Sequence, residues 1–213
     1  MNVYIKIFMV NILIYTFIYC FSFFSLEVLK RKNILSVNST RRTIHLGAAI
    51  IACTFPMYLS LPQVLILSFI LLGIMILSKY HSLLSHIHKV DRKSWGEIFY
   101  PLGIMISAIS FLPSDIDGFR IVILILGVSD LLANIIGTHL GSHSFEVFKC
   151  RKTLEGSIAF FVSTLVILLV FQISPLIAVF IAVIATLTEF FSPYGSDNLT
   201  VPIIVSALLI FLK

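Results

Sequence analysis

The residues with the clearest capacity for chemistry lie in one stretch, residues 127–157, which reads GVSDLLANIIGTHLGSHSFEVFKCRKTLEGS. Its first part is apolar and helix-like, yet it contains Asp130. An ionisable residue inside a membrane helix is costly, so an acid at this position by default marks a functional site. Cations and a second acid follow across a short loop: Lys149, Arg151, Lys152 and Glu155. Carboxylates suit a divalent cation and basic side chains suit phosphate, so the stretch is typical of phosphate chemistry.

One helical face carries the polar and the small residues of this stretch. Asp130, Asn134, Gly137 and Gly141 follow at spacings of four, three and four residues, which places them on the same side of a helix. The G-x-x-x-G spacing is more typical of close helix packing than of a phosphate cradle. We therefore expect the two glycines to allow close packing.

The acidic residues are placed more selectively than the basic ones. Five of the ten lie near the predicted cytoplasmic ends of the chain's apolar segments, either at the end or about two helical turns from it. They are Glu97, Asp130, Glu155, Glu189 and Asp197. Solvation of loops would not place acids in this way, whereas a shared polar pocket would. We therefore predict a polar pocket open to the cytoplasm and lined by these acids.

Cations and turn residues near these acids have both a functional and a structural interpretation. Arg41 and Arg42 open the run that contains His45, and two guanidinium groups suit phosphate geometry. Cations also flank membrane helices for reasons of topology alone, and this applies equally to the basic loop at residues 149–152.

The acids at the ends of two other runs have simpler explanations as well. Glu97 stands at the head of a predicted helix, where the helix dipole favours a negative charge. Asp197 and Asn198 lie in a turn, SPYGSDN, where both can cap a helix. Either explanation leaves a role in phosphate or metal binding open.

The composition predicts an all-α, polytopic membrane protein with a single domain over residues 1–213. Of the 213 residues, 59% are hydrophobic and only 12% are charged, and the mean hydropathy is +1.07. A soluble domain is nearer half apolar and a quarter charged. The net charge of +5 is divided among several loops, so nucleic acid is not a predicted partner.

Eight apolar runs are candidate membrane helices, at residues 3–26, 44–60, 63–78, 97–112, 119–138, 155–172, 175–191 and 199–212. Several are shorter than the ~20 residues of a straight span, so we predict seven to nine spans. If the chain crosses the membrane at each run, every second connecting segment lies on the same side of the membrane. These segments are 29–43, 79–96, 139–153 and 192–198. Twelve of the 15 Lys and Arg residues lie there, which predicts that this side is cytoplasmic.

Familiar soluble phosphate-binding and hydrolytic motifs are absent from the sequence. It contains no P-loop, no protein-kinase signature, no nucleophile elbow and no H-E-x-x-H. Acids for a divalent cation and basic residues for phosphate remain, all at one predicted membrane surface. Phosphoryl transfer requires these groups, because metal and cations must neutralise the developing charge.

Four segments, in order, resemble the CTP-dependent polyprenol and phytol kinases, the family of dolichol kinase, phytol kinase and the yeast-type diacylglycerol kinase. Residues 41–45 resemble the family's R-K-x-x-H motif, with Arg in place of Lys, and residues 96–103 resemble its G-E-x-x-x-P-x-G segment. Residues 129–157 resemble its S-D-x-x-A…G-x-x-x-G…K-[ST]-x-E-G-S block, which is the specific part. Residues 189–202 resemble its closing E…G-x-D-N…P element.

This resemblance implies an integral membrane kinase that transfers the γ-phosphate of CTP to the hydroxyl of an isoprenoid or similar lipid alcohol. Its expected partners are the lipid alcohol, the nucleoside triphosphate and membrane lipids, with the active site facing the cytoplasm. The matched catalytic residues are Asp130, Lys152, Glu155, His45 and Glu97. The matched nucleotide or phosphate ligands are Arg41, Arg42, Lys152, Thr153 and Asn198, and Lys149 and Arg151 of the basic loop are expected phosphate ligands as well. The other motif residues are Gly137, Gly141 and Glu189.

A triphosphate brings about four negative charges close to these acids, so a divalent cation must intervene, and Mg²⁺ suits carboxylate and phosphate oxygens. Asp130 and Asp197 are the expected metal ligands, because each matches a family motif near a helix end. Glu155 is expected to hold Lys152 or a metal-bound water. Either His45 or Glu97 is expected to take the proton from the lipid hydroxyl.

Two other functions stay open, and one departure from the family is noted. Asn134 stands where many members have a small residue, which concerns helix packing. The related phosphatidate cytidylyltransferase carries a longer C-terminal motif with paired aspartates, so the short segment 195–198 favours a kinase over an enzyme that forms a CDP-activated lipid. A small proton-coupled transporter with relays at Asp130 and Glu189 is the second alternative. Nothing in the residues themselves distinguishes CTP from another nucleoside triphosphate.

Overall fold

Apolar helices joined by short turns make up a computed structural model that describes residues 3–31, 37–81 and 95–213. We call a helical segment that runs once from one end of the molecule to the other a pass. The passes without a change of winding are α1 (Val3–Arg31), α2 (Val37–Cys53) with the short α3 (Phe55–Tyr58), α4 (Leu61–His81), α6 (Gly96–Phe111), α9 (Leu154–Val170), α10 (Pro175–Phe191) and α11 (Asp197–Leu212). One further pass combines α7 (Ile116–Leu124), η1 (Ile125–Ser129) and α8 (Asp130–His139). Each predicted apolar run falls on one pass, which confirms the all-α prediction.

Three helices in the described ranges are long and apolar enough to cross a membrane: Tyr4–Leu26, Leu61–Tyr80 and the composite Ile116–His139. The other apolar helices contain 10–17 residues, fewer than the ~20 of a straight span. A bundle of seven to nine membrane spans therefore stays a prediction.

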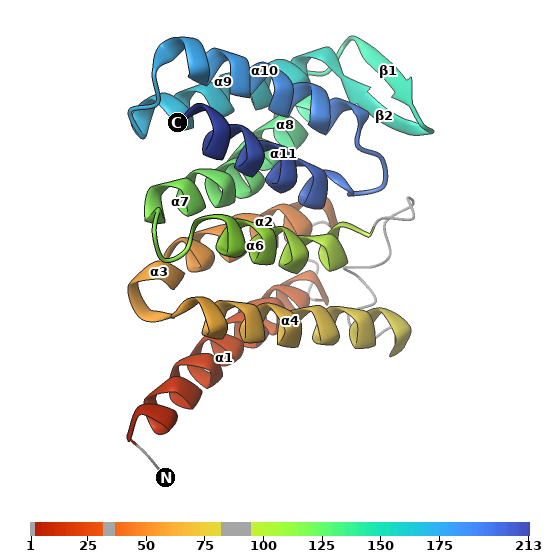
Figure 1. Cartoon of the computed structure of the whole chain (residues 1–213). Helices are drawn as coiled ribbons and strands as arrows, with labels where there is room; N and C mark the ends of the chain where they lie inside the picture. Colours follow the sequence, from red (N-terminus) through yellow and green to blue (C-terminus); the bar gives the residue numbers. More distant parts are fainter. Residues whose placement is uncertain (1–2, 32–36, 82–94) are drawn as a thin grey trace.

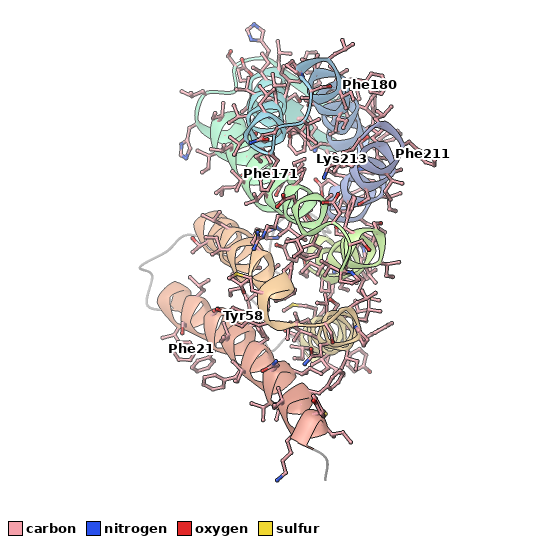
Figure 2. The ribbon with its side chains drawn as sticks, turned by 60° about the vertical axis from the view of Figure 1, so that its left-hand side comes forward. Phe21, Tyr58, Phe171, Phe180, Phe211 and Lys213 are labelled. Atoms are coloured by element: carbon pink, nitrogen blue, oxygen red, sulfur yellow. The ribbon has the colours of Figure 1, made fainter. Side chains whose placement is uncertain are left out.

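Large apolar side chains cover the outside of the bundle. Phe21, Phe180 and Phe211 are exposed, and Figure 2 shows them on the outer surface of the helices. The inside is closed by fully buried side chains such as Phe119 and Phe160. An apolar exterior of this extent marks a surface that meets a membrane or another apolar partner.

The composite helix changes its winding directly before Asp130. Residues Ile125–Ser129 form a π-helical turn between two α-helical parts. Such turns are rare and often occur at functional sites. Gly127 in this turn lies against α2, where a Cβ would collide with Ala49. The π turn therefore packs closely against α2 and determines where Asp130 enters α8.

The helices stack side by side in alternating directions (Figure 1). Helix α6 packs against α4 and α11, α9 packs against α8 and α10, and α1 packs against α2 and α4. The ends of α4 and α8 and the starts of α6 and α11 gather at one end of the stack, as Figure 1 shows. The chain's two termini lie at the opposite end.

A β-hairpin stands at the end of the stack where these helix ends gather. It consists of β1 (Ser144–Val147) and β2 (Cys150–Thr153), which pair antiparallel. The sequence interpretation treated residues 139–153 as a basic loop, so the hairpin is a correction. Its turn residues, Phe148 and Lys149, both have positive φ angles, as a two-residue hairpin turn of type I′ requires.

The orientation of the stack gives a first prediction. If the hairpin end is cytoplasmic, a cysteine at Ser144 in a background without the native cysteines will react with an impermeant maleimide only after cells are permeabilised. A cysteine at Ser114, in the turn between α6 and α7 at the other end, serves as the control and should react in intact cells. Labelling of position 144 from outside would overturn the orientation. Residues 82–94, in the second predicted cytoplasmic segment, lie outside the described part.

Candidate functional site

The Lys152 side chain points from the hairpin toward the C-terminal end of α10. Cross-strand partners lie on the same face of a strand pair, and Lys152 is paired with Phe145. The Phe145 ring packs against Phe190 of α10, with 6.2 Å between the ring centroids. The pair Glu146 and Arg151 occupies the opposite face of the hairpin. The strand therefore turns one cation of the basic segment inward and leaves its neighbour outside.

Lys152 forms the centre of a polar cluster. Its ammonium forms an ion pair with the buried carboxylate of Glu189 and also donates a 2.9 Å hydrogen bond to the Glu189 backbone carbonyl. Asp197 lies 3.9 Å away on its other side. Burial alone would lower the pKa of Lys152, but the charges of Glu189 and Asp197 outweigh it and hold that pKa above its ordinary value. Lys152 is therefore cationic at neutral pH.

Asp130 belongs to the same cluster. Its charge acts on both Lys152 and Glu189. Two of the five acids in the predicted polar pocket, Glu189 and Asp197, thus pair with one lysine, and a third, Asp130, lies within electrostatic reach of it. They come from α8, α10 and α11, so the start or end of three helices supplies the cluster. The other two acids of the predicted pocket lie in different surroundings.

Glu155 is bound to the loop before the hairpin. Its carboxylate accepts hydrogen bonds from the Ser142 hydroxyl at 2.6 Å, from the Ser142 amide at 3.1 Å and from the His143 amide at 3.1 Å. It also lies 2.8 Å from Nδ1 of His143. The expectation that Glu155 holds Lys152 is therefore corrected, since Glu189 does so. Glu155 fixes the path of the chain from α8 into the hairpin instead.

Gly137 allows α8 to cross the start of α9 at very short range, and Gly141 packs on Thr153 just after the helix has ended at His139. The prediction that Gly141 lies on the same helical face as Asp130 is therefore wrong. A Cβ at Gly137 would lie 2.6 Å from Oγ1 of Thr153 and 3.5 Å from Cα of Gly156. Thr153 is buried and caps α9, since its side chain accepts a hydrogen bond from the Gly156 amide. The close-packing interpretation of the two glycines is confirmed. Thr153, a predicted phosphate ligand, caps α9 and packs against Gly137 in this contact.

Replacing Gly137 by alanine should destabilise the protein, because the added methyl group has to displace Thr153 or α9. Overpacking of this kind costs about 1–3 kcal/mol. Thermal unfolding in detergent would measure it. Gly73→Ala is the matched control, since a Cβ at Gly73 meets nothing within 4 Å. Equal unfolding temperatures for the two variants would show that this crossing tolerates side chains.

Asn198 fastens the start of α11 to the start of α6. Its side-chain amide donates a 2.9 Å hydrogen bond to the backbone carbonyl of Gly96, and its side chain is 1% exposed. Close by, the Trp95 amide donates to the carbonyl of Tyr194 at 2.8 Å. These bonds position Asp197 beside Lys152. Asn198, a predicted nucleotide ligand, therefore holds the start of α11 in place through its hydrogen bond to Gly96.

His45 and Glu97 form a second group, on facing helices α2 and α6. Both line one pocket, and Tyr100 stands between them on α6, with its ring 5.2 Å from the His45 ring. Glu97 lies 3.7 Å from Lys79, whose ammonium also sits over the Trp95 ring. Sequence reasoning missed Tyr100, although its spacing of three residues from Glu97 already placed both on one helical face.

Tyr100 lies between the two groups. Its hydroxyl donates a long hydrogen bond of 3.5 Å to the backbone carbonyl of His45, and it lies within electrostatic reach of the Asp130 carboxylate. Asp130 therefore acts on the Lys152 cluster on one side and on the wall of the second group's pocket on the other.

The remaining predicted phosphate ligands are placed only in part. Lys149 lies in the exposed hairpin turn and Arg151 on the outer face of β2. Arg41 and Arg42 belong to α2, within about one turn of His45. Their side chains lie outside the described part of the chain, so their predicted contacts with phosphate stay predictions.

Comparison with curated proteins identifies two relatives. The chain is 30% identical over 188 residues to phytol kinase from Synechocystis sp. (strain ATCC 27184 / PCC 6803 / Kazusa), which covers 83% of this chain and 80% of that protein. It is 37% identical over 116 residues to an uncharacterized protein of Methanocaldococcus jannaschii, which covers 54% of this chain and 57% of that protein. No family model matches the chain, and no solved structure matches it significantly.

Proposed function

The chain belongs to the phytol kinase family and is a lipid-alcohol kinase-like protein, and from this premise we propose its reaction. It transfers the γ-phosphate of a nucleoside triphosphate to the hydroxyl of an isoprenoid or similar lipid alcohol. CTP is the proposed donor, on the resemblance of residues 41–202 to the CTP-dependent members. The active site is the hairpin end of the bundle, facing the cytoplasm.

The observation that carries the proposal is the cluster around Lys152. Together with a divalent cation, the Lys152 ammonium held beside the carboxylates of Glu189 and Asp197 would bind a phosphate group and neutralise charge in the transition state. The pairing with Glu189 holds the ammonium in place before the nucleotide arrives. Such preorganisation is what phosphoryl transfer requires of a protein, since catalysis there depends on positioning and electrostatics.

We further propose that the same cluster holds a divalent cation. Mg²⁺ takes one or two protein carboxylates and completes its coordination with phosphate oxygens and water. Within the described ranges no group of three or more His, Cys, Asp or Glu side chains could enclose an ion, whereas Asp130 and Asp197 provide the two carboxylates. We propose that these two would hold Mg²⁺, which would supply positive charge to offset the charge of the phosphates.

The reaction then needs an acceptor and a base. The oxygen of the lipid hydroxyl attacks the γ-phosphorus, the bond from that phosphorus to the bridging oxygen breaks, and the nucleoside diphosphate leaves. The proton of the hydroxyl passes to a side chain, for which His45 and Glu97 are the candidates on the pocket wall. Arg42, at the start of α2, is proposed to contact the triphosphate.

A direct assay tests this function. Purified protein is incubated with Mg²⁺, with radiolabelled CTP or ATP, and with phytol, a polyprenol or diacylglycerol in mixed micelles. The proposal expects labelled lipid phosphate with an isoprenoid alcohol and more of it with CTP than with ATP. Absence of a labelled lipid from every alcohol and both nucleotides would contradict the proposed function.

A further inference from the structure

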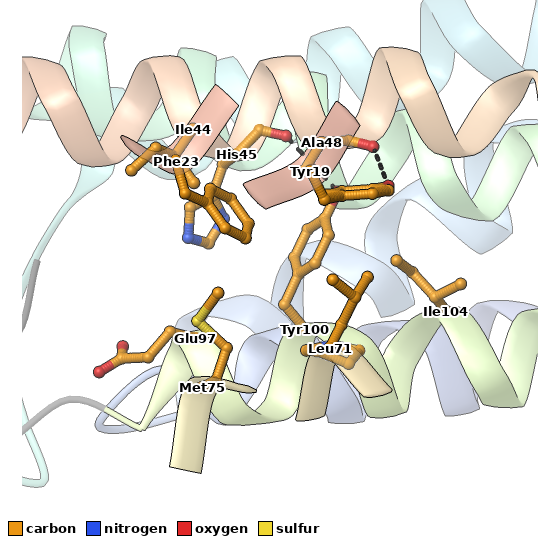
Figure 3. Close-up of a pocket in the computed structure, with 11 residues that line it drawn as sticks. Tyr19, Phe23, Ile44, His45, Ala48, Leu71, Met75, Glu97, Tyr100 and Ile104 are labelled. Carbon is orange, nitrogen blue, oxygen red and sulfur yellow. Dashed lines mark hydrogen bonds between the residues drawn. The ribbon is translucent and has the colours of Figure 1, made fainter. Parts of the chain in front are cut away.

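An apolar pocket lies between α1, α2, α4 and α6 (Figure 3). It encloses about 600 Å³, its open mouth included. Its walls are aromatic and aliphatic: Tyr19, Phe23, Ala48, Leu71, Met75 and Ile104. Apolar walls of this kind with a few polar groups among them are typical of a small-molecule site.

The helices present these residues at helical spacing. His45 and Ala48 follow three residues apart on α2, and Leu71 and Met75 follow four apart on α4. On α6 the pocket face begins at Glu97 in the first turn and continues to Ile104 seven residues later. Each helix therefore lines the pocket with one face, over about one turn on α1, α2 and α4 and about two turns on α6.

The pocket is polar at one end only. Figure 3 shows the His45 imidazole and the Glu97 carboxylate near one end and Ile104 toward the other. The Tyr19 hydroxyl, which also reaches this pocket, already donates to the Ala48 carbonyl at 2.9 Å. A ligand that fits these walls has one hydroxyl-sized polar end and an apolar remainder.

The polar end lies beside the phosphate site. The π turn before Asp130 packs on α2 at this point, since a Cβ at Gly127 would lie 3.6 Å from the His45 carbonyl oxygen. Tyr100, on the pocket wall, is within electrostatic reach of Asp130, and Asp130 acts on Lys152. A hydroxyl held between His45 and Glu97 would thus lie at the end of the pocket where α2 meets the π turn that leads into Asp130.

We propose that this pocket is the acceptor site, and that it takes the tail of a single-chain lipid alcohol with the hydroxyl between His45 and Glu97. The inference rests on the proposed function and names its substrate class. One apolar compartment with one polar end accommodates one hydrocarbon chain.

Filling the pocket tests the inference. Met75→Trp places a larger ring inside it, while Ile76→Trp puts the same ring on the exposed side of the next residue of α4 and serves as the matched control. Met75→Trp should raise the KM for phytol by about tenfold or more. It should leave the KM for the nucleotide unchanged and retain activity toward a five-carbon prenol. Ile76→Trp should match the wild type in all three.

Ala48→Phe fills the pocket from α2 and serves if Met75→Trp does not fold. An unchanged KM for phytol in whichever of these variants folds would overturn the pocket assignment while leaving the kinase function standing. A similar rise in KM for phytol and for the five-carbon prenol would also overturn it, because a tail pocket acts on the tail. A wild-type protein that phosphorylates no alcohol would overturn the proposed function itself and the inference with it.

Discussion

Asp130→Asn is expected to abolish phosphoryl transfer at every Mg²⁺ concentration, while the protein still inserts into the membrane and stays monodisperse in detergent. The substitution keeps the size of the side chain and removes the charge. In the proposed site that charge binds the metal and acts on Lys152, so its loss affects the nucleotide complex and leaves the helix packing intact. Turnover with saturating lipid and nucleotide, measured over a Mg²⁺ titration, is the readout.

Asp117→Asn is the matched control, because Asp117 is an exposed acid at the opposite end of the same composite helix. It should retain wild-type turnover. If Asp130→Asn keeps more than about a tenth of the wild-type turnover, the barrier has risen by less than ~1.4 kcal/mol. Asp130 would then be a packing residue, and the metal would have to bind elsewhere.

Lys152→Ala is expected to have two separable effects. It leaves the buried Glu189 carboxylate without its cation, which costs on the order of 3–5 kcal/mol of stability. It also removes a charge-assisted contact to phosphate, worth about 1.5–3 kcal/mol, so nucleotide affinity should fall roughly tenfold to a hundredfold. Thermal unfolding in detergent and equilibrium nucleotide binding measure the two effects independently.

A double variant separates these roles. Lys152→Ala combined with Glu189→Gln removes the uncompensated charge, so it should recover most of the lost stability and none of the lost nucleotide affinity. Recovery of both would mean that Lys152 is only the counterion of Glu189. Loss of stability with unchanged nucleotide affinity in the single variant would lead to the same conclusion.

The sequence predicted the helices well because hydrophobic runs and their polar boundaries are local features. All eight apolar runs coincide with helical passes in the described ranges. The hairpin was missed because its turn consists of Phe148 and Lys149, and the usual Asn-Gly or Asp-Gly signal for a type I′ turn is absent. The π turn before Asp130 has no sequence signal of its own either, since its residues suit an ordinary helix.

The sequence predicted which residues form the site better than it predicted which of them pair with one another. Lys152 and the acids were identified from their placement near helix ends, but the partner of Lys152 is Glu189, 37 residues along the chain, and not the nearby Glu155. Pairing across such a distance depends on the direction in which a strand points its side chains, and this strand was not predicted. Tyr100 was missed because an aromatic residue on an apolar helix face is ordinarily a packing residue.

The position of the transferred phosphorus tests the central claim most directly. Purified protein is given phytol and CTP labelled with ³²P in either the α or the γ position, and the lipid and nucleotide products are separated. A lipid kinase places only the γ label in the lipid and releases CDP that keeps the α label. An α label in the lipid together with released pyrophosphate would identify a cytidylyltransferase, and an unlabelled lipid in both reactions would contradict group transfer to the alcohol.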